Sequence, residues 1–315
     1  MSAGTTTMSL AERIRACDPP PRDPKAVARA RAAIITAFGR TLSGAPSAIT
    51  TALLATSGVA AAGGSSLVFG TERRTSAIEA ALVNATAAVA GSDASPDAAN
   101  GAFVVSLFGL CEERGKTGQE FVDALLAGAG IVRSLPSAGR LAAPLLGSVA
   151  AAARLLGLSA AKIAAALLMA VAADAGTPAA GQGGAEALMV GQGLRNALLA
   201  ALLAEAMDEA SCQQMIEDDQ RAAGEALPGA EALDLLALRS PPGADLWDQF
   251  DRHVGAILPR DDVAPLFERL ETIDKVKDLA TVSRLLQGRG LRAAPKKVVF
   301  APRGTHEPEE TNWVP

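Results

Sequence analysis

The stretch GSVAAAARLLGLSAAKIAAALLMAVAAD, residues 147–174, decides the fold class. It consists mainly of alanine and leucine, which are among the strongest helix-forming residues. Gly157 is at a position where a glycine can end one helix, and Ser159 is at a position where a serine can cap the start of the next. The stretch therefore predicts two consecutive helices, whose small side chains let neighbouring helix axes approach closely.

The same helix signals recur along the chain. Apolar residues at helical spacing predict helices at residues 26–44 and 194–210, and two short helices between residues 263 and 286. Two more helices begin with the spacing of a capping box, in which a Ser or Thr and a Glu three residues later satisfy free backbone N–H groups. These pairs are Ser76 with Glu79 and Thr117 with Glu120.

The composition supports an all-α fold. Of the 315 residues, 49% are hydrophobic but only 3% are aromatic, so the apolar mass is alanine, leucine and valine. We predict a helical bundle that forms a single domain at residues 26–290. A flexible, proline-rich leader at residues 1–25 precedes it and a polar tail at 291–315 follows. Only KKVVF, residues 296–300, is typical of a strand.

Charge and hydropathy exclude several classes of partner. The net charge is −5 and no long Lys/Arg run is present, which argues against nucleic-acid binding. The N-terminal residues lack the apolar core of a secretory signal, and the apolar runs are too short, or too diluted by Gly, Ser and Thr, to cross a membrane. Three widely spaced cysteines without a CxxC pair indicate reduced thiols and no metal site. We expect a cytoplasmic protein.

Four segments carry a resemblance to a known family. The order of these segments resembles the helical domain of the MmgE/PrpD family, which contains 2-methylcitrate dehydratase and cis-aconitate decarboxylase. The segments are SSLVFGTERRTSAIEAALVNATAAVAGSDAS (65–95), LCEERGKTGQEFVDALLAGAGIVRSL (110–135), the opening stretch extended to residue 176, and GQGLRNALLAALLAEAMD (191–208). The resemblance covers about residues 26–208, with a weaker echo at 265–286. It implies an all-α core and a homodimer.

The chain departs from this family in length. Family members insert an α+β lid domain between the main helical region and the closing helices. Here only a connection at residues 219–262 occupies that place, and it is too short for such a domain. We therefore expect little or no lid.

The second departure concerns reactive residues. The family motif N-G-x-x-x-H-x-x-D-x-D-D, aligned on Asn84, places a valine at the histidine and Ser or Ala at the acidic positions. The family lysine and histidine of K-x-L-H-x-G are also replaced, as are the histidine and threonine of G-[FW]-H-x-T. The replacing residues are Val89, Ser92, Ala94, Ser95, Glu186, Met189, Ala138 and Arg140, while Gly191 is retained.

These replacements exclude the known activities of the family. Dehydration of a citrate-like acid, or loss of CO2 from an unsaturated tricarboxylate, requires a proton carrier and cations that hold the carboxylates. The chain has only two histidines, His253 and His306, and both follow the helical core in sequence. We expect neither 2-methylcitrate dehydration nor cis-aconitate decarboxylation.

Several polar residues remain as candidates for a site. Asp93 and Asp97 could act as an acid/base pair, although a Ser/Asp/Pro loop exposed to solvent needs no function. Arg140 could hold a carboxylate or enolate with its forked donors, or lie on the surface at a helix start. Glu186 is the fourth catalytic candidate. The proposed lining of a substrate pocket is Asn84, Val89, Ala138, Gln182 and Met189.

The glycine-rich segment at residues 176–193 contains Gln182 and Glu186. Its six glycines predict a loop that approaches a ligand closely, but it has neither the dinucleotide nor the P-loop pattern. No cofactor is expected. Two functions stay open: a diverged lyase, isomerase or cyclase that acts on a largely hydrophobic biosynthetic intermediate of specialised metabolism, or a catalytically inactive relative that binds a ligand or a partner protein.

Overall fold

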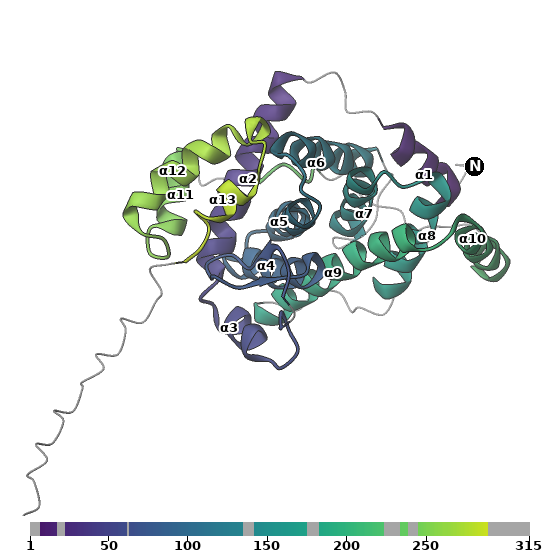
Figure 1. The fold of residues 1–315 in the computed structure, drawn as a ribbon, viewed down its shortest axis with the longest axis horizontal. Helices are drawn as coiled ribbons and strands as arrows, with labels where there is room; N and C mark the ends of the chain where they lie inside the picture. The colour runs from purple at the N-terminus through teal and green to yellow at the C-terminus, as the bar shows by residue number, and fades with distance from the viewer. Residues whose placement is uncertain are drawn as a thin grey trace, which may run out of the picture.

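A computed structural model describes residues 7–17, 23–61, 63–134, 142–174, 183–223, 234–238 and 245–288. Within these ranges the chain forms thirteen α-helices, one 3-10 turn and a two-stranded ribbon (Figure 1), so the predicted all-α class is confirmed. The elements in order are α1 (Thr7–Ala16), α2 (Pro24–Gly44), α3 (Ala48–Ala55), β1 (Ser66–Leu67), β2 (Arg74–Thr75), α4 (Ala77–Ala90), α5 (Ala98–Glu113), α6 (Gly118–Arg133), α7 (Ala142–Leu156), α8 (Ala160–Asp174), α9 (Gly184–Ala206), α10 (Glu209–Ala223), α11 (Leu246–Val254), α12 (Arg260–Glu271), η1 (Ile273–Lys275) and α13 (Ala280–Ser283).

Helix α5 lies at the centre of the bundle, with α2, α4, α6 and α7 around it (Figure 1). Its side chains are apolar on nearly every face, and a helix of that kind is stable only when it is enclosed by other elements. Four phenylalanine rings fix its neighbours. Phe108 of α5 packs edge-to-face on Phe38 of α2, Phe69 after β1 and Phe121 of α6, with ring centroids 5.1 to 5.7 Å apart.

Helices α2 and α4 touch through two glycines. A Cβ on Gly44 would lie 1.9 Å from the Ala87 carbonyl oxygen, and a Cβ on Gly91 would lie 2.0 Å from the Arg40 carbonyl oxygen. Only residues without a side chain permit this approach. The contact fixes the end of α4 against α2, and so it fixes the starting point of the segment that leads into α5.

The predicted capping signals have different outcomes. Thr117 and Glu120 form the complete reciprocal box at the start of α6. At α4 the Ser76 side chain accepts from the Glu79 N–H, but the Glu79 carboxylate pairs instead with Arg195 of α9 at 3.0 Å. Ser159 accepts from the Lys162 N–H and begins α8 as predicted.

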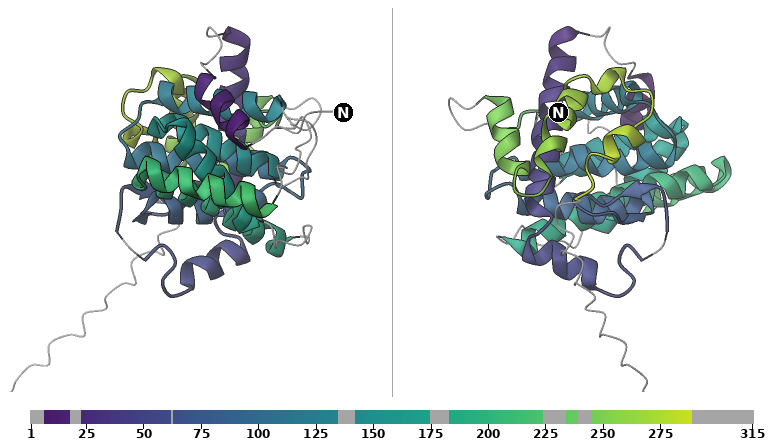
Figure 2. Two further views of the ribbon diagram at one scale, coloured as in Figure 1. Left: turned by 90° about the vertical axis from the view of Figure 1, so that its right-hand side faces the viewer. Right: turned by 60° about the vertical axis from the view of Figure 1, so that its left-hand side comes forward.

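Other parts differ from the prediction. The leader predicted to be flexible contains α1, because Leu10, Ala11 and Ile14 form an apolar stripe that is buried and packs mainly against α8. Figure 2 shows α1 lying against helices from the middle of the chain. Helix α11 falls inside the predicted connection at 219–262. The predicted tail and the strand at residues 296–300 lie outside the described residues.

Helix α9 begins at Gly184, ten residues before the predicted helix start at 194. The glycine-rich segment from Gly184 onward is therefore helical rather than a loop. By length and composition α9 alone among the described helices could cross a bilayer, but 56% of its apolar window is buried inside the bundle, as in the core helix of a globular fold.

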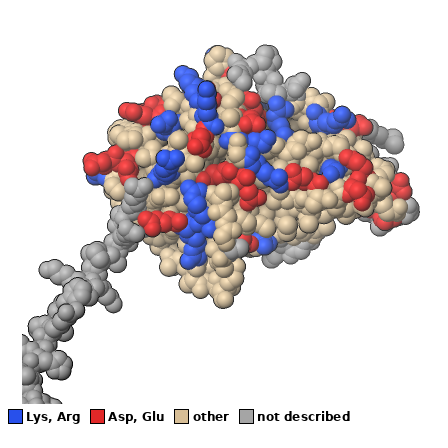
Figure 3. Space-filling model, viewed as in Figure 1, with Lys and Arg blue, Asp and Glu red and all other residues tan. Residues whose placement is uncertain are grey.

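The face shown in Figure 3 interleaves acidic and basic side chains in a band across its middle, while the projection formed by α3 is largely uncharged. Leu53 and Leu54 of α3 pack against a small apolar cluster that contains Val68 and Val83. Helix α3 therefore forms an apolar wall that stands out from the main bundle.

Candidate functional site

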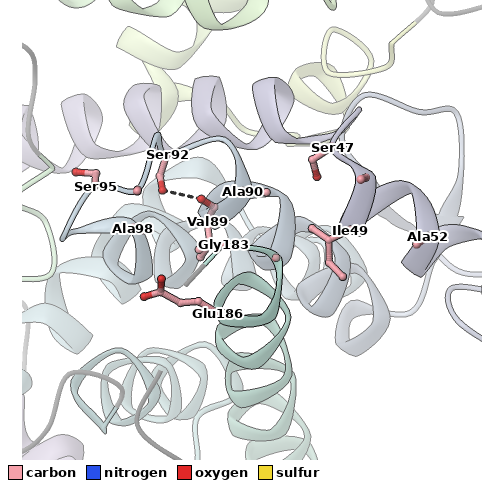
Figure 4. A pocket seen from close by; sticks show the side chains of 13 residues that line it. Ser47, Ile49, Ala52, Val89, Ala90, Ser92, Ser95, Ala98, Gly183 and Glu186 are labelled. Carbon is pink, nitrogen blue, oxygen red and sulfur yellow. Dashed lines mark hydrogen bonds between the residues drawn. The ribbon is translucent and has the colours of Figure 1, made fainter. Parts of the chain in front are cut away.

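A pocket of about 560 Å³ lies between α3, the segment that joins α4 to α5, and the first turn of α9 (Figure 4). Most of its lining is apolar, with three serines and one carboxylate. The lining residues are Ser47, Ala48, Ile49, Ala52, Val89, Ala90, Ser92, Ala94, Ser95, Ala98, Gly183, Gly184 and Glu186. A concave, mainly apolar site with few polar groups is typical of small-molecule binding.

Three helices begin at this pocket. Ser47 caps α3 by accepting a hydrogen bond from the Thr50 N–H at 3.3 Å. Asp97 is the N-cap residue of α5, and Gly183 is that of α9. Gly183 has φ of 72°, a left-handed conformation that glycine adopts without strain, and this lets the chain enter α9 against Ile49.

The segment between α4 and α5 is turned sharply at Asp93 and Ala94. Both residues are left-handed, with φ of 50° and 56°, which is unfavourable for a residue with a Cβ and most of all for alanine. Hydrogen bonds hold the turn: the Ser92 hydroxyl donates to the Val89 carbonyl at 2.6 Å, and the Ser95 N–H donates to the Ser92 carbonyl. The turn places Ser92, Ala94 and Ser95 on the pocket wall.

A buried ion pair supports this wall from behind. The Arg40 guanidinium of α2 donates to the Asp97 carboxylate at 2.9 Å, and both side chains are less than a tenth exposed. The same carboxylate oxygen accepts the Ser95 hydroxyl at 2.5 Å. Asp97 is thus a fixed acceptor that orients Ser95 and does not itself line the pocket.

His253 of α11 also belongs to this region. Gly39 of α2 lies directly beneath its side chain. Burial and then the Arg40 charge lower the pKa of His253 from its ordinary value of 6.5, whereas the Asp93 carboxylate opposes that shift. His253, the one histidine in the described residues, therefore lies against the helical core near the 92–97 turn, although it follows that core in sequence.

Comparison with known proteins adds no relative. No protein-family model matches the chain, and a search of curated proteins finds no match either. The likeness to MmgE/PrpD proteins therefore rests on the segments and motif positions described above.

The predicted site residues separate into groups. Val89 and Glu186 line the pocket. Asp93 is exposed, next to two lining residues but not among them, and Met189 is half-buried outside the lining. Asn84 is buried and serves the fold, since its side chain accepts from the Phe69 N–H at 3.0 Å and donates to the Leu67 carbonyl at 2.9 Å. Three predicted residues, Ala138, Arg140 and Gln182, lie outside the described residues.

Sequence reasoning missed the contribution of α3 to the pocket. Ser47, Ile49 and Ala52 form one side of it, yet the motif comparison began only after this helix. Ser47 followed by an apolar run is an N-cap signal, so the helix itself was recognisable. Its contact with α9, in which Ile49 packs near Gly184, joins residues far apart in the chain and has no local signature.

A smaller cavity of about 310 Å³ lies at the other end of α5 and is lined by residues that include Cys111, Glu112 and Arg74. Burial raises the pKa of the Cys111 thiol, so this cysteine stays protonated and unreactive. Burial also raises the pKa of Glu112, which accepts from the Leu67 N–H and from Arg74. These groups tie the ribbon to α5, so the cavity has a structural explanation.

Proposed function

We propose that the pocket beside α3 binds a largely hydrophobic small molecule, and that the chain is a diverged MmgE/PrpD-like enzyme. The reaction would be a cofactor-independent lyase, isomerase or cyclase step on a biosynthetic intermediate of specialised metabolism, not 2-methylcitrate dehydration. One observation supports this proposal above the others. Positions 89, 92, 94, 95 and 186, where the family motifs carry reactive groups, come from two distant segments and line a single pocket.

The chemistry available in this pocket is limited and specific. Ile49, Val89 and Ala98 offer apolar contact that excludes water and holds a substrate in one orientation, and orientation alone lowers a barrier substantially. Glu186 is the only ionisable side chain among the described lining residues, and its carboxylate can accept a proton or a hydrogen bond from the substrate. We assign to Glu186 the polar contact with the reacting end.

A non-catalytic binding protein is the second candidate. It is favoured by the positions of the two aspartates that were predicted to act as an acid/base pair. Asp97 is fixed by Arg40, and Asp93 is exposed to solvent outside the lining. A pocket with a single carboxylate suits ligand binding as well as catalysis, and only turnover distinguishes the two.

We also propose that the protein is a cytoplasmic homodimer. The helices are rich in alanine, and Leu203 on α9 is 45% exposed. The resemblance to MmgE/PrpD proteins implies dimerisation, and alanine-rich helices can pack closely across a symmetric contact. Light scattering at micromolar concentrations should give twice the mass of the 31.9 kDa chain; a monomer mass would contradict the proposal.

The function is tested by metabolite comparison. Extracts of wild-type and deletion strains are compared, and the compound that accumulates in the deletion strain is incubated with purified protein. Turnover by the wild type and by the surface control Glu268→Gln, with loss in Glu186→Gln, supports the enzyme. Binding of the compound without turnover supports the second candidate. Turnover of 2-methylcitrate or cis-aconitate that is lost on substitution of a lining residue would overturn the proposal.

A further inference from the structure

The Glu186 carboxylate faces the pocket without a protein partner in the described part of the chain, and from this we infer that the ligand carries a protonated amine at that end. The natural ligand class is then an amphiphilic amine, an apolar body with one primary or secondary ammonium group. This inference rests on the proposed function, since it names the chemistry of the molecule that would occupy the same pocket.

The first step concerns Glu186 itself. Two other carboxylates on or against α9 are paired. Glu79 of α4 pairs with Arg195 of α9 at 3.0 Å, and Glu205 of α9 pairs with Arg114. Glu186 is half-buried among apolar lining residues, and within the described ranges it has neither a hydrogen bond nor an ion pair. A carboxylate that a ligand removes from water needs a compensating charge or donor, and an ammonium group supplies both.

The second step concerns the serine hydroxyls. Ser92 donates its hydrogen to the Val89 carbonyl, because a carbonyl oxygen can only accept. Ser95 donates its hydrogen to the Asp97 carboxylate, which also accepts from the Arg40 guanidinium. Both hydroxyls therefore present lone pairs to a ligand. The side chains of Ser92, Ser95 and Glu186 on this wall therefore offer hydrogen-bond acceptors, which suits a ligand that carries donors.

The third step is the arrangement of polar and apolar groups. Glu186 extends from the start of α9 toward the side where Ala98 and Ser95 lie, and Ile49 and Ala52 of α3 lie at the opposite side (Figure 4). A ligand that satisfies both sides has a charged end and an apolar end. The volume of about 560 Å³ accommodates such a small molecule.

An anionic ligand is disfavoured despite the three helix starts. Helix N-termini attract negative charge, but two of them already carry an acidic residue of the protein itself. Glu186 lies in the first turn of α9, and Asp97 is the N-cap residue of α5. The third, α3, has Ser47 as its cap. A second carboxylate in the pocket would meet Glu186 as a like charge.

A matched series of probes tests the inference on the full chain. Cyclohexylmethylamine, cyclohexylmethanol and cyclohexanecarboxylate share one apolar body and differ in the charged or neutral end. Isothermal titration at pH 7.5 and low salt should show the amine binding about 10-fold or more tightly than the alcohol, because a charge-assisted hydrogen bond is roughly twice as strong as a neutral one. The carboxylate should bind most weakly.

Variants assign the preference to Glu186. Glu186→Gln should reduce the amine-to-alcohol ratio to about 1, while Glu186→Asp, which keeps the charge, should retain a preference for the amine. Glu268→Gln on α12 removes an exposed carboxylate elsewhere and should leave the ratio unchanged. Thermal unfolding checks that each variant is folded, and the wild-type series decides the inference even where a variant fails that check.

The outcomes separate this inference from the proposed function. Equal binding of the amine and the alcohol, or tightest binding of the carboxylate, would overturn the amine assignment and leave the apolar pocket as a binding site. An amine preference that survives in folded Glu186→Gln would also overturn it. If none of the three probes binds, the proposed function fails together with the inference.

Discussion

The Arg40 guanidinium lies 2.9 Å from the Asp97 carboxylate, and both side chains are buried beneath the turn that leads from α4 into α5. The pair joins α2 to the start of α5, and through the Ser95 hydroxyl it reaches the pocket wall. A carboxylate held in this way is costly to remove, because its loss takes a counter-charge away from a buried cation. Asp97 is therefore a positioning residue.

Asp97→Ala should lower the free energy of unfolding by about 3 to 5 kcal/mol, the usual effect of breaking a buried ion pair. Asp251→Ala is the matched control, because Asp251 pairs with Arg260, which is 73% exposed, and such pairs contribute less than about 1 kcal/mol. Urea unfolding followed by circular dichroism measures both. Equal, small effects would contradict the structural role of the Arg40 pair.

Gly191 and Gly193 of α9 give a second test. A Cβ on Gly191 would lie 2.2 Å from Thr86 Oγ1 and 2.8 Å from the Leu82 carbonyl oxygen of α4, whereas no heavy atom lies within 4 Å of a Cβ on Gly193. Gly191→Ala should therefore destabilise by about 1 to 3 kcal/mol through overpacking. Gly193→Ala should instead stabilise by up to about 1 kcal/mol, because alanine is the better helix former. Thermal unfolding distinguishes the two signs; a stabilising Gly191→Ala would disprove the close contact.

Asn84 was predicted to bind substrate, and its observed hydrogen bonds predict a stability effect. Asn84→Leu removes the partners of the buried Phe69 N–H and Leu67 carbonyl, which should cost about 2 kcal/mol or more. Asn196→Ala, which removes only a bond to Gln192 along α9, should cost less than about 0.5 kcal/mol. If Asn84→Leu keeps full stability but loses ligand binding, the substrate role holds instead.

The helices were predictable because their signals are local. Gly157 and Ser159 separate two alanine-rich helices in the sequence, and the structure has α7 and α8 there. The start of α9 was not predictable by the same rule, since its glycines are typical of a loop. Gly191 is tolerated within this helix because it lies against α4, and that contact between distant segments outweighs the helix propensity.

The pocket was predictable only in part, for a related reason. The motif comparison selected Val89 and Glu186, which do share a pocket. It considered Asp97 as an acid/base residue at the pocket, whereas Asp97 is buried and bonded to Arg40. Arg40 belongs to an earlier helix, and no periodicity connects the two residues. It also set His253 aside as lying beyond the core, whereas α11 packs on α2. Pairings between distant elements are decided by tertiary packing.

The last prediction concerns pH and His253. Its pKa in the folded protein is lowered, first by burial and then by the nearby Arg40 and Arg252 charges, while Asp93 acts in the opposite direction. In the unfolded chain it returns to about 6.5. Between the folded value and 6.5 the unfolded state binds more protons, so the stability present above pH 6.5 is lost as the pH falls through this window.

His253→Gln removes this linkage, so between pH 7.5 and 5.5 its urea midpoint should fall less than that of the wild type. The variant comparison isolates His253, because the lowered pKa of Asp274, whose ordinary value is 3.8, acts only at lower pH. The raised pKa of Glu112 makes stability fall as the pH rises, which is the opposite direction, but this contribution is present in both proteins and cancels in the comparison. Asp93→Asn removes the charge that opposes the shift, so this variant should lose stability more steeply than the wild type over the same range. Equal pH slopes in all three proteins would show that His253 has the same pKa in the folded and unfolded states.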